Sequence, residues 1–347
     1  MIGKKSKLAV LTLAVAAAVS AAGCGVSGPK DAKPAASAAA EQKPLQKMRV
    51  AYSTSLCEAS TIIAYEKGYF KEEGIDAEMI NVDGASETDA LGTLKVDGMQ
   101  TLVSKVIQPI QNGLPVKITA GLHTGCVKVE ARNDGSVNSI ADLRGKKVGV
   151  GGIGDTGAVI LQRALLMNHI GVKPGEQEVE FVVVEKSSLA AALQNGQVDA
   201  IAVTDPTATI SEKQYGFKPI LDTAKSPEFK NEYCCSAMVT SKFAAEHPDL
   251  AKGFTKAVMK GAAYIGKHPE EVAQLLHDKK YIAGDVQQNI ELLKSYSFIP
   301  SASGGYKALE DATAQLGEIG LVKKVDPKEL ADKAFLKFDD LPDTPEV

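Results

Sequence analysis

Short apolar runs rich in valine and isoleucine recur along the chain, and each is followed by a segment with helical spacing. Buried parallel strands have near-continuous apolar sequences of this kind, and the connections between them are usually helices. The pattern therefore predicts a parallel α/β sheet, with strands at residues 48–53, 77–82, 116–122, 146–152, 180–185 and 199–204.

The character of the chain changes after Thr240, where apolar residues recur at helical spacing over long segments. Two shorter helices, at 86–98 and 187–197, are predicted between the strands, and both end at Gly or Asn-Gly, where a helix cap is favoured. We therefore expect a sheet that is built first and then covered by helices at 249–267, 269–280, 285–296 and 304–320.

The first residues have the pattern of a secretory signal: three lysines precede an apolar run over residues 8–22 that is too short to span a membrane. The run ends in "AAGC", which resembles the lipobox of bacterial lipoproteins. This predicts a signal peptide at 1–23, lipidation of Cys24 and a disordered tether at 24–47, rich in Ala, Ser and Pro. The alternative is an ordinary signal followed by a free cysteine. Either way we expect an exported protein, and with the lipid it would be anchored outside the cytoplasmic membrane.

Charge limits the classes of partner. The sequence has 39 Lys and Arg against 43 Asp and Glu, and loss of the signal with its three lysines would change the net charge from −4 to −7. Such a mildly acidic, mixed composition argues against nucleic acid as a partner. The roughly 300 residues after the tether exceed one simple core and suggest two lobes.

Four segments, at 64–80, 140–165, 189–208 and 239–258, occur in the order seen in one family. They resemble the substrate-binding proteins of ABC importers for alkanesulfonates, taurine, nitrate and thiamine pyrimidine precursors. The resemblance implies a type II periplasmic-binding-protein fold in which two α/β lobes are joined by two crossing strands. It implies lobe 1 at 48–128 and 240–347, lobe 2 at 129–239, a monomer that is not an enzyme, and a permease and an ATPase as partners.

Ligands of open α/β sheets bind beyond the carboxyl ends of the strands, so the loops that follow the predicted strands should form the site. Each polar residue there also has an ordinary explanation as a helix cap, worth about 1 kcal/mol. The expected ligand-binding residues are Ser53, Ser55, Cys57, Ser104, His123 and Cys126 from lobe 1, Asp155, Thr156 and Asp205 from lobe 2, and Cys234 and Cys235 at the hinge.

The four remaining cysteines all map to this edge, and they leave three interpretations open. The first is that they are buried small side chains, and the second is that they form disulfides. A Cys57–Cys126 disulfide is geometrically easier than one between the neighbours Cys234 and Cys235, which would be strained. The third is that they are thiolate ligands. In the third case Cys57, Cys126, Cys234, Cys235 and His123 would hold a soft metal, metalloid or Fe–S species as ligand, and no cofactor would be required.

Two further patterns bear on the ligand. The segment that begins at Cys234 resembles a segment of eukaryotic thiamine-pyrimidine synthases. In those enzymes the segment begins with a longer run of cysteines that is associated with iron, and this chain has only two of these cysteines. The nominated loops contain no arginine, which lowers the expectation of a sulfonate or nitrate and raises that of a neutral, soft or metal-containing ligand.

The sequence "GVGGIG" at 149–154 fits the dinucleotide fingerprint and makes an oxidoreductase a remote alternative. The acidic residue that would bind the ribose, Glu185, lies 31 residues after Gly154, whereas about 20 is usual. An exported chain would also lack a dinucleotide pool.

Overall fold

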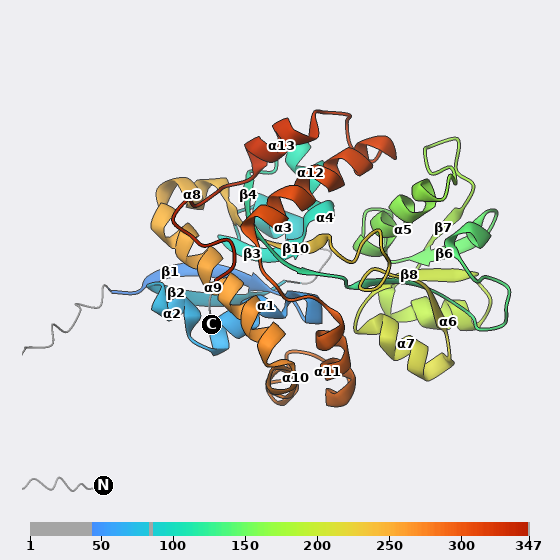
Figure 1. The fold of residues 1–347 in the computed structure, drawn as a ribbon, viewed down its shortest axis with the longest axis horizontal. Coiled ribbons are helices and arrows are strands. Elements are labelled where there is room, and N and C mark those ends of the chain that lie inside the picture. Colours follow the sequence, from blue (N-terminus) through green and yellow to red (C-terminus); the bar gives the residue numbers. More distant parts are fainter. Residues whose placement is uncertain (1–43, 83–85, 346–347) are drawn as a thin grey trace, which may run out of the picture. The chain divides into compact units, whose positions relative to one another are not determined.

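The computed structural model describes residues 44–82 and 86–345. Its strands form two sheets of five strands each (Figure 1). In spatial order the first contains β2 (Ile75–Asn81), β1 (Gln46–Tyr52), β3 (Gly98–Leu102), β10 (Tyr233–Thr240) and β4 (Val116–Thr124). The second contains β7 (Glu180–Val183), β6 (Lys147–Val150), β8 (Ala200–Thr204), β5 (Val127–Ala131) and β9 (Lys218–Asp222).

Both sheets are mixed, which corrects the expectation of purely parallel strands. In the first sheet β1 runs parallel to β2 and β3, whereas β10 is antiparallel to β3 and β4. In the second, β6 runs parallel to β7 and β8, whereas β5 is antiparallel to β8 and β9. The antiparallel strands β5 and β10 are those that follow the crossings between the sheets, and each enters its new sheet from the opposite direction.

The chain passes between the sheets twice, which confirms the expected architecture of two α/β lobes joined by two crossing segments. The first crossing lies between Thr124 and Val127, and the second between Asp222 and Tyr233. The lobes therefore change earlier than the expected 128/129 and 239/240. The clearest difference is β10, which belongs to lobe 1 because its residues pair with β3 and β4.

Helices cover both faces of the first sheet (Figure 1). α1 packs on α9, and α12 packs on β4 and α4. Two glycines permit these contacts: a Cβ at Gly261 of α9 would lie 2.2 Å from the Ser60 carbonyl oxygen, and one at Gly305 of α12 would lie 2.2 Å from the Gly121 nitrogen. The helices are α1 (Ala59–Glu66), α2 (Tyr69–Glu72), α3 (Glu87–Gly92), α4 (Val103–Gln111), α5 (Thr156–Met167), α6 (Leu189–Gln194), α7 (Thr207–Tyr215), α8 (Ser241–Glu246), α9 (Pro248–Lys267), α10 (Pro269–Asp278), α11 (Val286–Ser295), α12 (Ala302–Glu318) and α13 (Pro327–Ala334), with short 3₁₀ turns at Leu56–Glu58, Ile140–Leu143 and Lys186–Ser188.

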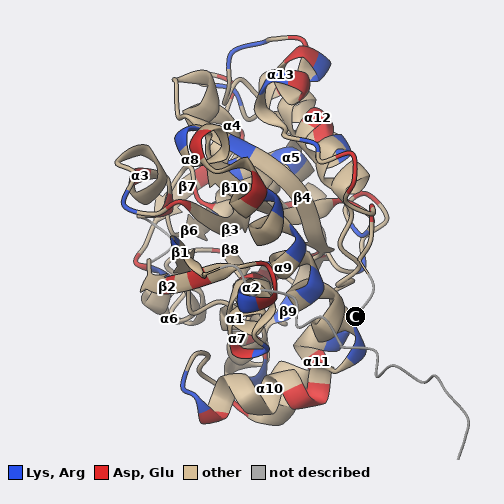
Figure 2. Ribbon diagram, turned by 90° about the vertical axis from the view of Figure 1, so that its left-hand side faces the viewer, with Lys and Arg blue, Asp and Glu red and all other residues tan. Residues whose placement is uncertain are grey.

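The predicted signal peptide, Cys24 and the tether up to residue 43 lie outside the described residues. The last two tether residues, Gln46 and Lys47, are part of β1 and pair with Ile75 and Asp76, so the ordered fold begins earlier than expected. Within the described ranges, no helix has the length and apolar character needed to cross a bilayer. Basic and acidic residues are interspersed over the helices and loops (Figure 2), in keeping with the mixed composition.

Candidate functional site

The structure brings the four cysteines and His123 together at the crossing segments. Cys57 lies in the turn after β1 and Cys126 in the first crossing, while Cys234 and Cys235 begin β10. The Cys126 and Cys234 sulfurs are 3.4 Å apart, and the Cys234 sulfur lies 3.6 Å from His123 Nδ1. All four cysteines are free thiols, and only Cys234 is partly exposed. The Cys57–Cys126 pair that we expected to be easiest to bridge is thus not joined.

A β-bulge explains how two neighbouring cysteines reach one cluster. Successive residues of a regular strand point to opposite faces. In β10, however, Tyr233 pairs with Thr124 and Cys235 pairs with His123, so Cys234 is left without a partner on β4. The extra residue of a bulge re-aims side chains. Both thiols therefore lie with the other members of the cluster.

His123 is held in one orientation by buried hydrogen bonds and rings. Its Nε2 lies 2.7 Å from the Cys57 carbonyl oxygen, which also accepts a 2.6 Å hydrogen bond from Gln100. The rings of Tyr296 and Phe298 lie 5.6 and 4.7 Å from the imidazole. Burial lowers the pKa of His123, so the neutral ring is favoured. Nδ1 lies 3.2 Å from the Thr124 carbonyl oxygen and 3.6 Å from the Cys234 sulfur, so each ring nitrogen faces a backbone carbonyl.

The thiols have divergent acidities. The hydrogen bond with Cys126 and burial raise the pKa of Cys57 to about 12, and the hydrogen bond with Cys234 raises the pKa of Cys126 to about 11. Burial is the largest cause that raises the pKa of Cys235. Burial also opposes ionisation of Cys234, but hydrogen bonds from Cys126 and Cys235 outweigh it and lower the pKa of Cys234 to about 6. The cluster thus contains one favoured thiolate among protonated thiols.

A second buried polar pair adjoins the thiols. Burial raises the pKa of both Asp205, which follows β8, and Tyr296, which follows α11. Among the described residues, neither Asp205 Oδ2 nor the Tyr296 hydroxyl has a hydrogen-bond partner, although Lys128 Nζ lies 3.7 Å from that carboxylate oxygen. Buried polar atoms normally have partners. These two are therefore candidates to contact a ligand or water.

Asp155 belongs to a separate charged group between the lobes. Its carboxylate caps α5 by accepting a 2.7 Å hydrogen bond from the Ala158 amide. Burial raises the pKa of Asp155, whereas the charges of Lys186 in lobe 2 and Lys105 in lobe 1 act to lower it. Lys186 donates to Thr204 at 2.9 Å. This group is suited to a ligand that carries charge.

The remaining expected residues have local roles. Ser53 donates a 2.5 Å hydrogen bond to the buried carboxylate of Glu58, and the Ser55 hydroxyl lies 3.0 Å from the Cys57 sulfur. Ser104 is buried in the first turn of α4, and Thr156 is buried at the start of α5. The structure thus gathers the cysteines with His123 and Asp205, and keeps Asp155 and Thr156 in the other group.

Sequence reasoning missed several residues of both groups. Lys105 and Lys186 could have been found, because each directly follows a nominated loop or predicted strand. Gln100, Tyr296 and Phe298 carry no local signal. Gln100 lies inside β3. The two aromatic residues follow α11, more than 150 residues after His123 in the sequence, so only the folded structure shows that they are neighbours.

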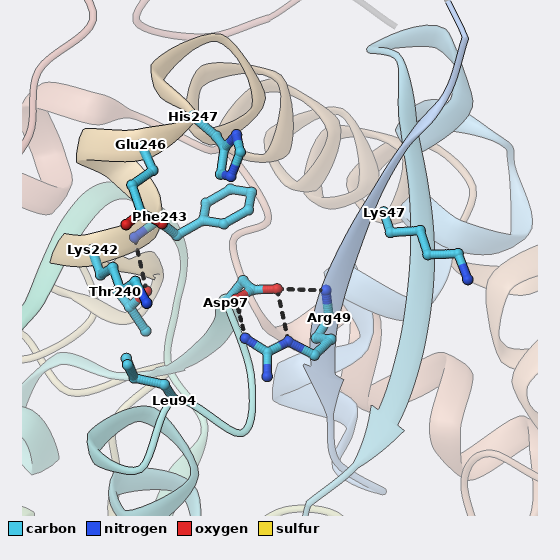
Figure 3. A pocket seen from close by; sticks show the side chains of 9 residues that line it. All are labelled: Lys47, Arg49, Leu94, Asp97, Thr240, Lys242, Phe243, Glu246 and His247. Atoms are coloured by element: carbon cyan, nitrogen blue, oxygen red, sulfur yellow. Dashed lines mark hydrogen bonds and ion pairs between the residues drawn. The ribbon is translucent and has the colours of Figure 1, made fainter.

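A hollow of about 260 Å³ lies at the opposite edge of the first sheet (Figure 3). Arg49 and Asp97 point toward each other there, with Arg49 Nη2 2.5 Å from Asp97 Oδ1. The Phe243 and His247 rings are 5.1 Å apart. The hollow, which Lys47, Lys242 and Glu246 also line, is separate from the thiol cluster.

Comparison with known proteins gives the family. The family model described as "NMT1/THI5 like" matches residues 58–272. The chain belongs to the NMT1/THI5-like family. This NMT1/THI5-like protein is 26% identical over 325 residues to a putative aliphatic sulfonates-binding protein of Bacillus subtilis, covering 91% of this chain and 92% of that protein. It is 25% identical over 246 residues to the Saccharomyces cerevisiae 4-amino-5-hydroxymethyl-2-methylpyrimidine phosphate synthase THI5, covering 66% and 68%.

Among solved structures, the NMT1/THI5-like chain is similar to the alkanesulfonate-binding protein from Xanthomonas axonopodis pv. citri bound to MOPS. The TM-score is 0.68 at 13% identity, covering 85% of this chain and 100% of that one. The expected type II periplasmic-binding-protein fold is confirmed.

The structure also argues against the oxidoreductase alternative. In dinucleotide-binding folds the pyrophosphate lies at the helix amino terminus. Here the Asp155 carboxylate occupies that position on α5, and Asp155 Oδ2 would lie 2.6 Å from a Cβ placed on Gly151. An anionic side chain at this point would repel a phosphate.

Proposed function

We propose that the protein is an exported solute-binding protein that captures a small thiophilic solute between its lobes and delivers it to the permease and ATPase of an ABC importer. In this proposal it acts as a monomer held at the membrane through lipid on Cys24. The observation that carries it is the meeting of soft donor groups from separate segments at the hinge.

The donor set fits a soft ligand. Thiolate sulfur selects Cu(I), Zn and Fe–S species, whereas hard cations prefer oxygen ligands. Two groups, Cys57–His123–Cys235 and Cys126–Cys234–Cys235, each have ligand atoms within 4.8 Å of one another. The thiols are free rather than joined in disulfides, which leaves their sulfurs able to bind.

The position of the site couples binding to lobe movement. Cys126 lies in the first crossing, and its amide donates a 3.0 Å hydrogen bond to Thr223, at the start of the second. The backbone amide of Asp205, in lobe 2, donates a 3.1 Å hydrogen bond to the Cys126 carbonyl oxygen. A ligand that contacts all of these groups only when the lobes are closed would favour the closed form.

The test uses the full chain with C24S, purified without oxygen and with its thiols counted. We expect Cu(I) to bind at one equivalent or more by equilibrium dialysis and elemental analysis, and C126S/C234S to bind fewer equivalents than the parent. H123A should weaken Cu(I) binding, and H247A, which changes the separate hollow at the opposite sheet edge, is its matched control. Fully reduced protein that retains no soft metal would refute the thiophilic function.

A second candidate is an organic anion or a pyrimidine-type solute, with the cysteines in a structural role. It is favoured by the charges of Lys105 and Lys186, which act on Asp155 from both lobes, and by relatives that carry sulfonate-binding names. A thermal-shift series with taurine, an alkanesulfonate, nitrate and a hydroxymethylpyrimidine would test it. If one of these ligands stabilised the parent and C126S/C234S but not K186M, the function as an organic-solute binder would be established instead.

A further inference from the structure

The two three-ligand groups in the thiol cluster have one member in common. Cys235 belongs both to the group with Cys57 and His123 and to the group with Cys126 and Cys234. Within the described part of the chain, no four such ligand atoms all lie within 4.8 Å of one another. The cluster is thus two adjacent triads that share a sulfur, rather than one tetrad.

Cys235 is held at the junction by the sheet. β10 lies between β3 and β4, and Cys235 pairs with Leu102 on one side and with His123 on the other. Its side chain is fully buried. A sulfur fixed in the middle of a sheet stays between the triads, whereas Cys234, in the bulge and partly exposed, has room to adjust.

His123 completes the first triad in the orientation that metal ligands adopt. Ligating imidazoles usually donate their other ring N–H to a carboxylate or a backbone carbonyl, which fixes the tautomer. Here Nε2 faces the Cys57 carbonyl oxygen at 2.7 Å and Nδ1 faces the Thr124 carbonyl oxygen at 3.2 Å, so whichever nitrogen binds the ion, the other has a carbonyl to accept its proton. The same carbonyl accepts from Gln100, which holds the turn that carries Cys57.

The arrangement distinguishes between soft metals. Structural zinc sites are closed tetrahedra of four ligands, in which all pairs of sulfurs are nearly equidistant. Two triads that share a sulfur do not offer this geometry. Soft thiolates select Cu(I), and that ion is commonly bound by three thiolate or imidazole ligands in a plane, with one thiolate able to bridge two ions.

The geometry points to a two-ion site: Cys235 bridges two Cu(I) ions, one held with Cys57 and His123 and the other with Cys126 and Cys234. This rests on the proposed thiophilic function and specifies its cargo as a pair of soft monovalent ions. Each protonated thiol that binds releases its proton to solvent, and copper remains Cu(I) throughout.

The experiment titrates Cu(I) into the reduced full chain with C24S under anaerobic conditions, against a coloured Cu(I) chelator. Two equivalents should bind, and X-ray absorption at the copper edge should show copper–copper scattering. C57S and C126S should each retain one equivalent and lose this scattering, and C235S should lose it as well. H247A should behave as the parent, and thermal unfolding checks that each variant is folded.

The outcomes separate the two proposals. One equivalent, or two without copper–copper scattering, would overturn the bridge and leave the thiophilic function standing. No binding by fully reduced protein would overturn both. A single tetrahedral Zn²⁺ bound by all four thiols in preference to Cu(I) would also overturn the bridge. If C235S fails to fold, the spectrum of the parent still decides.

Discussion

Replacement of Arg163 by methionine should weaken the attachment between the lobes. Arg163 lies in α5 of lobe 2 with 1% of its side chain exposed. Its guanidinium donates hydrogen bonds of 2.8 and 2.5 Å to the carboxylate of Glu232 in the second crossing, and another to Gln315 of α12 in lobe 1. It also lies 5.1 Å from the Phe229 ring. One side chain thus connects lobe 2, a crossing segment and lobe 1.

The magnitude follows from the burial of the pair. Removing one partner of a fully buried ion pair costs about 3–5 kcal/mol, because the other charge is left unpaired. Glu232 keeps 16% of its side chain exposed, so water compensates in part. We therefore expect R163M to lower the free energy of unfolding by about 2–3 kcal/mol. Methionine preserves the apolar stem, so the loss reports the guanidinium rather than a cavity.

Urea unfolding of R163M, E232Q and the double variant measures the coupling between the two side chains. The double variant should lose less than the sum of the single variants by about 1 kcal/mol or more, since each single change leaves one member without its partner. R144M is the matched control: its partner is Glu178, and both side chains are largely in solvent, so it should change little. Additive losses in the cycle, or an equal loss in R144M, would refute the reasoning.

Three further predictions concern buried groups. Burial raises the pKa of Glu130 to about 8 from its usual 4.5, so the folded state keeps this proton at pH values where the unfolded state loses it. The stability of the fold should therefore fall as pH rises from about 4.5 toward 8. In thermal unfolding, the unfolding temperature of E130Q should fall less over this pH range. The Tyr296 hydroxyl faces the Asp205 carboxylate but has no partner in hydrogen-bond geometry, so Y296F should unfold at an equal or slightly higher urea concentration, and a loss above about 1 kcal/mol would contradict this. Cys234, with its pKa lowered to about 6, should be the first of the four clustered thiols alkylated by iodoacetamide at neutral pH, as peptide mass spectrometry would show, whereas the buried Cys57 and Cys235, whose pKa values are raised, should react later.

The edge of the sheet at which the candidate residues lie was predictable. Apolar runs locate strands, and the carboxyl ends of neighbouring parallel strands meet at one edge, so loops at positions 57 and 126 could be placed together before their contacts were known, and the two-lobed fold that the resemblance implies brought position 205 to them. The long helices after Thr240 were predictable for a similar reason, because an amphipathic pattern over 20 residues, as in α9, leaves little ambiguity.

Of the four strands that the six predicted runs do not cover, two, β5 and β9, were missed for identifiable physical reasons. β5 carries Lys128 and Glu130, which suggest a solvated strand or loop, yet both are buried because Lys128 pairs with Glu212 at 2.9 Å and Glu130 accepts a 2.5 Å hydrogen bond from Ser211. β9 contains Pro219, which is typical of edge strands, and β9 does lie at the edge of its sheet. Partners distant in the sequence decide both cases.

The adjacent cysteines show where prediction from local pattern ends. In a regular strand Cys234 and Cys235 would face opposite sides of the sheet, and one of them would be lost to the cluster. The bulge that prevents this is set by the register between β10 and β4, two strands separated by the whole of lobe 2 in the sequence. Because this register is also where the second crossing enters lobe 1, any change in the angle between the lobes must act on the residues that position the Cys234 sulfur. Under the proposed function, occupation of the cluster and movement of the hinge would be one equilibrium, because a ligand that fixed the sulfur of Cys234 against that of Cys126 would resist opening of the lobes to the extent that it binds.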